Sequence, residues 1–136
     1  MEQDQDLAAR QEARTLARQA EKAQHLLADF PQEKLDAIVE AIASAFSAQA
    51  ETLAKNAVEE TGFGNVPDKI TKNRFASETV AKAVRGMKTV GLLRKSGKDR
   101  VWEIGVPVGV IAAIVPSTNP TSTVCYKAMI ALKAGN

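Results

Sequence analysis

Apolar residues recur at intervals of three and four positions through most of the first two-thirds of the chain, which is the period of an amphipathic α-helix. The strongest run covers residues 31–61, where Pro31 suits the first turn of a helix and Gly62 supplies a left-handed stop. A narrower apolar stripe predicts a helix over residues 1–29, and residues 65–86 continue the same periodicity. The pattern therefore predicts three helices in this part of the chain.

The helical period ends after Lys88. Residues 91–100 mix glycine and serine with basic and acidic side chains, which predicts a solvated loop. Residues 101–104 (VWEI) predict a short strand, and residues 105–109 (GVPVG) predict a kinked connection. This stretch therefore marks a change from helical to strand structure.

A continuous apolar run follows at residues 110–115 (VIAAIV), which is typical of a strand buried on both faces of a parallel sheet. Residues 116–120 predict a turn, and residues 121–134 predict a helix that Gly135 ends. Strand, turn and helix make half of a βαβ unit. Its second strand would begin at Asn136, where the sequence stops, so we expect a truncated domain of the α/β class.

Composition and charge narrow the classes of protein. Hydrophobic residues make up 45% and charged residues 25% of the 136 residues, as in ordinary soluble globular domains. Lys and Arg number 18 against 16 Asp and Glu, and the two signs are interleaved, so we expect no nucleic-acid partner. The apolar runs are too short to span a bilayer, and the polar N-terminus lacks a secretory signal. We therefore expect a cytoplasmic protein without a membrane partner.

The chain has one cysteine, Cys125, and one histidine, His25, which excludes a disulfide within the chain and a zinc-type ligand cluster. Cys125 lies one turn into the last predicted helix, without a base nearby in sequence, which favours a buried structural cysteine. His25 lies in a polar helix and is expected at the surface. We therefore expect no metal site and find no catalytic triad or carboxylate pair.

The turn at residues 115–120 is the best candidate for a ligand site. In open α/β sheets, ligands bind where strands end and the following helices begin, because the first backbone N–H groups of the helix are free there. A cofactor or substrate loop is one interpretation. The alternative is that Asn119, followed by Pro120, is only the N-cap of the helix.

Two segments of the chain resemble the coenzyme-A-acylating branch of the aldehyde dehydrogenases. Residues 59–73 (EETGFGNVPDKITKN) are similar to that branch's ETG-x-G…DK…KN stretch, and residues 105–123 (GVPVGVIAAIVPSTNPTST) resemble the start of its nucleotide-binding domain. The final KAMIALKAGN is similar to the helix that follows there. The resemblance implies an N-terminal helical region at residues 1–98. It implies the incomplete start of a Rossmann-like NAD(P)-binding domain, with its first strand–turn–helix, at residues 99–136.

The resemblance also implies a reaction. Enzymes of this branch oxidise an aldehyde with NAD(P) through a cysteine thiohemiacetal and pass the acyl group to coenzyme A. Their nucleophilic cysteine lies in a separate catalytic domain, which Cys125 does not match, so we expect this chain alone to be inactive. Acetaldehyde is the commonest substrate of the branch, and propionaldehyde and sulfoacetaldehyde are the alternatives.

The same resemblance assigns candidate site residues. Val115, Pro116, Ser117 and Thr118 match positions that line the nicotinamide side of the cleft. In the wider superfamily this loop reads P-W-N-F-P, and its asparagine amide stabilises the oxyanion. Aligned on the two prolines, that asparagine falls on Thr118 and not on Asn119. Three readings stay open: another donor serves, Asn119 takes the role, or Asn119 is only a cap.

Relatives in this branch form homo-oligomers, and some are fused to an alcohol dehydrogenase. Some carry an N-terminal amphipathic peptide that docks on the protein shell of a bacterial microcompartment. For residues 1–20 we favour a helix that faces a core over shell docking. The rival hypothesis is a non-enzymatic helical interaction or assembly module. The incomplete βαβ unit argues against it, because its strand would expose unpaired edges.

Overall fold

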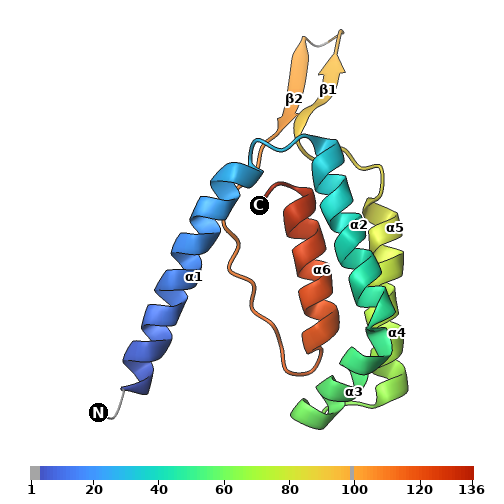
Figure 1. The fold of residues 1–136 in the computed structure, drawn as a ribbon. Coiled ribbons are helices and arrows are strands. Elements are labelled where there is room, and N and C mark those ends of the chain that lie inside the picture. The colour runs from blue at the N-terminus through green and yellow to red at the C-terminus, as the bar shows by residue number, and fades with distance from the viewer. Residues whose placement is uncertain (1–3, 99) are drawn as a thin grey trace.

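The computed structural model describes residues 4–98 and 100–136 of the chain. It is mostly helical, with one small antiparallel sheet (Figure 1). In chain order the elements are α1 (Gln5–Leu27), α2 (Gln32–Ala48), α3 (Ala50–Thr61), α4 (Val66–Arg74), the π-helix η1 (Phe75–Val80), α5 (Ala81–Val84), β1 (Gly91–Ser96), β2 (Val101–Gly105) and α6 (Pro120–Lys133).

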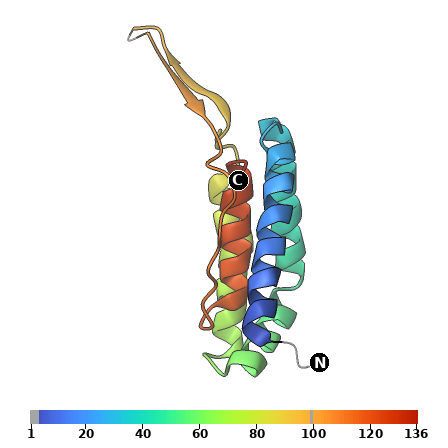
Figure 2. The ribbon, with the colours of Figure 1, turned by 90° about the vertical axis from the view of Figure 1, so that its left-hand side faces the viewer.

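The core lies where α2, η1 and α6 pack side by side (Figures 1 and 2). Leu35, Val39 and Ala43 are four residues apart and therefore share one face of α2, and all three are buried. Cys125 and Met129 repeat this spacing on α6 and are fully buried. The helical period read from the sequence thus identifies the faces that form the core.

The continuous helix predicted for residues 31–61 is wrong in one respect, because the chain breaks at Gln49 between α2 and α3. Gln49 leaves the helical region, with φ −107° and ψ 9°. The break redirects α3 so that Ala50, Ala54 and Ala57 are buried, with α3 packed against α4. Tertiary packing on both sides of the break explains why the apolar period continues through it.

The helix predicted for residues 65–86 is confirmed, with a π-helical turn in its middle. Asn65 caps α4: its Oδ1 accepts a hydrogen bond of 2.9 Å from the backbone N–H of Asp68. Pro67 occupies the first turn, where its missing N–H costs nothing. The cap and the proline fix the start of the helix that carries the residues described below.

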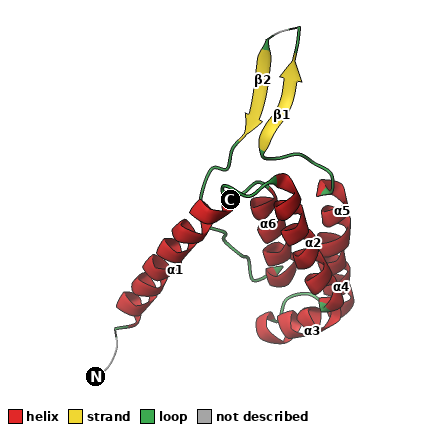
Figure 3. Cartoon of the chain, turned by 45° about the horizontal axis from the view of Figure 1, so that its top comes forward, coloured by secondary structure: helices red, strands yellow, loops and turns green. Residues whose placement is uncertain are grey.

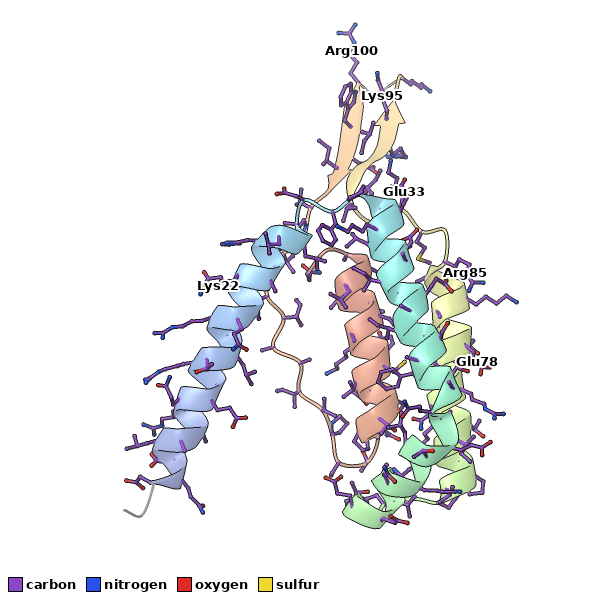
Figure 4. All side chains as sticks on the ribbon, in the orientation of Figure 1. Lys22, Glu33, Glu78, Arg85, Lys95 and Arg100 are labelled. Carbon is purple, nitrogen blue, oxygen red and sulfur yellow. The ribbon has the colours of Figure 1, made fainter. Side chains whose placement is uncertain are left out.

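The solvated loop predicted for residues 91–100 is wrong at residues 91–96, because these form β1 and pair with β2 in an antiparallel hairpin. The strand predicted at residues 101–104 is confirmed as part of β2. Arg94 forms a 2.6 Å ion pair with Glu103, and Lys95 stacks over the Trp102 ring at 4.6 Å. The hairpin projects from the helices, with Lys95 near its end (Figure 4). Charged residues that suggested a loop therefore lie on an exposed hairpin.

The predicted division of the chain between residues 98 and 99 falls between β1 and β2. Residue 99 lies outside the described residues. The division into a helical region and the start of a nucleotide-binding domain stays a prediction.

The buried strand predicted at residues 110–115 is wrong for this chain. The segment from residue 106 to residue 119 carries no strand and runs alongside α6 (Figure 1). Its apolar side chains are exposed, and Ile114 is 84% exposed. A strand needs hydrogen-bonded neighbours, and no described segment pairs with this one. The predicted α/β class is nonetheless confirmed: the N-terminal helices, the short strand β2 and the final helix α6 are all present.

Helix α1 lies apart from the core and buries none of its described residues (Figure 3). A hydrogen bond of 3.3 Å from Gln24 Nε2 to the carbonyl of Gly135 joins it to the chain just after α6. His25 is exposed, as predicted. Residues 1–3 of the predicted helix lie outside the described residues. Within residues 4–98 and 100–136, no helix combines the length and apolarity needed to cross a bilayer.

A partly buried polar network ties α6 to the start of α2. Lys133, almost fully buried, forms a 2.5 Å ion pair with Asp36. Gln32 donates to Asp36 at 2.8 Å and accepts from the backbone N–H of Thr89 at 2.8 Å. Burial acts to raise the pKa of Asp36, but the hydrogen bonds from Lys133 and Gln32 and the charge of Lys133 lower it overall. This network fixes the connection that leads into β1.

Candidate functional site

The predicted ligand loop ends in a turn that opens directly into α6. The backbone N–H of Asn119 donates to the carbonyl of Pro116 at 3.3 Å, which closes the turn. The backbone N–H of Thr123 donates to the carbonyl of Asn119 at 3.3 Å, which begins the helix. Pro120 occupies the first helical position. The backbone of this segment therefore has the turn-then-helix form expected from the sequence.

The side chain of Asn119 does not cap α6, although its backbone occupies the N-cap position. Its Oδ1 instead accepts a hydrogen bond of 3.0 Å from Nζ of Lys72 on α4. No described residue accepts a hydrogen bond from Asn119 Nδ2. The capping interpretation is therefore wrong for this side chain, and its amide hydrogens are available to an acceptor outside these contacts.

Two further residues of α4 hold the same turn. Lys69 is 4% exposed, and its Nζ donates to the carbonyl of Thr118 at 2.9 Å. Asn73 is buried as well: its Oδ1 accepts from Thr121 Oγ1 at 2.7 Å, and its Nδ2 donates to the Ala50 carbonyl at 3.0 Å. A buried ammonium or amide is costly without such partners. The burial of Lys69 therefore depends on the turn, and that of Asn73 depends on α3 and the first residues of α6.

Lys69, Lys72 and Asn73 were missed by the sequence reasoning. They lie at positions i, i+3 and i+4 of one helix and therefore share a face. A sequence signal for them existed. Lys69 and Asn73 occupy the buried stripe of α4, where apolar residues would be expected, and polar residues in such positions indicate specific partners. The two segments that carry the family resemblance thus meet in space through these hydrogen bonds.

An open pocket of about 360 Å³ lies beside the turn, between α4–η1 and α6. We call it the α4–α6 pocket. Its walls combine polar groups with apolar side chains, as small-molecule sites do. The lining residues are Lys72, Phe75, Ala76 and Val80 on one side and Asn119, Ser122, Thr123 and Tyr126 on the other.

The π-helix shapes one wall of this pocket. Lys72, Ala76 and Val80 follow one another at intervals of four, and an α-helix completes slightly more than one turn in four residues. The wider i→i+5 turn of η1 compensates for that drift, so Val80 returns to the side of the helix where Lys72 lies. π-Helical turns are rare and occur often at functional sites.

The four predicted cofactor residues, Val115, Pro116, Ser117 and Thr118, all lie on the exposed side of the loop. Their side chains make no hydrogen bond with any described residue. Val115 also lines a larger apolar hollow of about 560 Å³ between α1, the loop and α6. Val115 and Pro116 thus present apolar surface, and Ser117 and Thr118 present hydroxyl groups. The described residues add no glycine-rich turn for a pyrophosphate beside them.

Cys125 lies inside the core and is fully buried. Desolvation raises the pKa of its thiol to about 11, so the thiol is protonated at neutral pH. A protonated, enclosed thiol is a poor nucleophile. The prediction of a buried structural cysteine is confirmed. Among the described residues, no three His, Cys, Asp or Glu side chains form a metal-binding group.

Comparisons with known proteins agree along nearly the whole chain. The profile described as "Aldehyde dehydrogenase family" matches residues 3–136. The bifunctional aldehyde-alcohol dehydrogenase AdhE of Escherichia coli (strain K12) is 43% identical over 125 residues, which cover 92% of this chain and 14% of the relative.

Solved structures give the same picture. An acetylating aldehyde dehydrogenase from Geobacillus thermoglucosidasius matches with a TM-score of 0.96 and 50% identity, over 99% of this chain and 30% of that one. A mutant propionaldehyde dehydrogenase from the Clostridium phytofermentans fucose utilisation bacterial microcompartment matches with a TM-score of 0.74 and 35% identity, over 90% and 28%. The chain spans less than a third of the length of each of these relatives.

Proposed function

This chain belongs to the aldehyde dehydrogenase family, and from that premise we propose that it forms part of a coenzyme-A-acylating aldehyde dehydrogenase. The reaction converts an aldehyde, NAD(P)⁺ and coenzyme A to acyl-CoA, NAD(P)H and a proton. The observation that carries the proposal is the fit of nearly all of this chain to an acetylating enzyme of known structure. Acetaldehyde is the proposed substrate, with propionaldehyde and sulfoacetaldehyde as alternatives.

Val115, Pro116, Ser117 and Thr118 are the proposed contacts for the nicotinamide side of the cofactor. When bound, the nicotinamide accepts the hydride that the aldehyde carbon gives up. The apolar side chains of Val115 and Pro116 can exclude water from the ring, while the two hydroxyls can orient it. Lys69 supports this arrangement, because its hydrogen bond to the Thr118 carbonyl fixes the turn.

Asn119 and Thr118 are the proposed contacts for the oxygen of the reacting aldehyde. Addition of a cysteine thiolate to the carbonyl carbon moves an electron pair onto that oxygen, and a preorganised donor stabilises the negative charge. Asn119 Nδ2 and the Thr118 hydroxyl are both without a described acceptor, and Asn119 is favoured because Lys72 holds the other end of its amide. The thiolate must come from a cysteine other than the buried Cys125.

The assembly and location of the enzyme follow the same premise. We propose a homo-oligomer in the cytoplasm. The similarity to a microcompartment enzyme supports a bacterial microcompartment as the alternative location. Docking of α1 on a protein shell is the less favoured role for this helix. Its described residues are all unburied, so the helix can also pack against another part of the same enzyme.

Coenzyme-A-dependent NADH formation from acetaldehyde tests the function. The full-length enzyme that carries this segment is expected to form NADH and acetyl-CoA only when coenzyme A is present. The 136-residue chain alone is expected to form neither, because Cys125 is enclosed and protonated. Turnover by the purified 136-residue chain would contradict the assignment of the nucleophile to another part of the enzyme.

A further inference from the structure

We propose that Lys72 is a positioning residue that sets the orientation of the Asn119 side-chain amide, so that its Nδ2 is kept free to donate a hydrogen bond to the aldehyde oxygen. The inference rests on the proposed function and deepens it. Of the three roles that the sequence left open for Asn119, it selects that of oxyanion donor, and it assigns the orientation of the amide to Lys72.

The argument begins with the two ends of the amide. The oxygen and the NH₂ group of an asparagine have nearly the same shape, so hydrogen-bond partners decide which end points where. An ammonium group can only donate, and Lys72 Nζ lies 3.0 Å from Asn119 Oδ1. A flipped amide would place donor against donor. Lys72 therefore fixes Oδ1 on its own side and leaves the NH₂ group for another acceptor.

Lys72 also competes with the capping role of Asn119. An asparagine at an N-cap normally turns its oxygen to the backbone N–H of the second or third helical residue, here Thr121 or Ser122. No such bond forms in this structure. A hydrogen bond from a charged donor is stronger than one from a backbone amide, so Lys72 can outcompete the helix for this oxygen. Without Lys72, the amide is expected to return to the cap.

The surroundings hold the turn that carries Asn119, while Lys72 reaches it from an exposed position on α4. Lys69, three residues earlier on the same helix, anchors the carbonyl of Thr118 at 2.9 Å, next to Asn119 in the chain. The backbone and the side chain of the turn are thus held by two lysines of one helical face. Lys72 and Asn119 both line the α4–α6 pocket. The amide is therefore fixed beside a space that can admit a small molecule.

The test compares variants of the full-length enzyme. Lys72→Met removes the charge and keeps much of the length, and it is expected to lower kcat roughly tenfold or more. The KM values for NAD⁺ and coenzyme A and the thermal midpoint are expected to stay near those of the wild type. A merely structural lysine would instead lower the midpoint. Lys72→Arg, which keeps a cationic donor, is expected to recover most of kcat, and Lys55→Met on the exposed face of α3 is the matched control.

The variant Asn119→Asp separates the hydrogen bond that residue 119 accepts from Lys72 from the hydrogen bond that it donates to the aldehyde oxygen. The aspartate can accept from Lys72 even better than the amide does, but it has no N–H to offer, so the turn stays intact while the donor is lost. We expect a loss of roughly a hundredfold in kcat, on the scale seen for removal of an oxyanion donor. In the double variant Lys72→Met/Asn119→Asp, the two losses are expected not to add, because the lysine acts through the amide.

Crystal structures make the outcome independent of turnover. In Lys72→Met, Asn119 Oδ1 is expected to accept a hydrogen bond from the backbone N–H of Thr121 or Ser122. An amide that keeps its wild-type orientation, or a wild-type kcat for Lys72→Met, would overturn the proposal. If the wild-type enzyme shows no coenzyme-A-dependent turnover, the proposed function fails and the donor role of Asn119 falls with it. The orientation of the amide would still be judged separately by the structures.

Discussion

The ion pair between Asp36 and Lys133 should respond unequally to the removal of its two charges. The Lys133 side chain is 4% exposed and that of Asp36 is 37% exposed, so water solvates the carboxylate far better than the ammonium. In Lys133→Met, an apolar side chain replaces the buried one and Asp36 keeps its hydrogen bond from Gln32. In Asp36→Asn, the buried ammonium stays charged and loses its anionic partner.

The expected costs follow from this asymmetry. Removing one partner of a buried ion pair costs about 3–5 kcal/mol, because the other charge stays buried without compensation. For Asp36→Asn we expect about 3 kcal/mol, since the amide oxygen can still accept from Lys133. For Lys133→Met we expect about 1 kcal/mol, because the remaining carboxylate is solvated and screened.

Urea unfolding of the 136-residue chain at pH 7, followed by circular dichroism, measures both free energies. Glu40→Gln is the matched control, because Glu40 pairs with Arg85 at the surface and its loss should cost much less. The double variant Asp36→Asn/Lys133→Met should be more stable than Asp36→Asn alone, since it removes the unpaired ammonium. If Lys133→Met costs as much as Asp36→Asn or more, the reasoning from exposure is wrong.

Two further predictions concern titration. The folded pKa of Asp36 lies below its ordinary value of 3.8, so its contribution to stability is complete above that value and is lost as pH falls through the folded pKa. As pH decreases below about 4, the free energy of unfolding in urea should therefore fall more steeply for the wild type than for Lys133→Met. Cys125, with its thiol pKa raised to about 11, should resist alkylation by iodoacetamide in the native chain at pH 7 and react fully in urea, as measured by intact mass. Rapid labelling of the native chain would contradict the buried position of this thiol.

The helices and the family could be predicted because their signals are local. The spacing of Leu35, Val39 and Ala43 defines a buried face without any knowledge of its partner, and the stop at Gly62 is a property of one residue. Cys125 was placed correctly by the absence of a base beside it. Two long motifs sufficed for the family resemblance.

The errors arose where distant residues decide the structure. The break at Gln49 depends on the packing of α3 against α4, and β1 depends on pairing with β2 across the hairpin. The run at residues 110–115 has the composition of a buried strand, but strand formation needs neighbours that no described segment supplies. The roles of Lys69 and Lys72 require the knowledge that α4 lies against the turn before α6.

The exposed run at residues 110–115 also has a consequence for the physical behaviour of this chain in solution. Its six residues are apolar and uncharged and contain no proline, which is the composition of segments that stack into intermolecular β-structure. No described strand pairs with this run, and among the described residues only its Ile114 carbonyl accepts a side-chain hydrogen bond, from Lys127 Nζ at 2.6 Å, so a second molecule could pair with most of its backbone. Colloidal stability, more than the unfolding free energy of the helical core, is therefore expected to set the concentration at which the isolated chain can be handled.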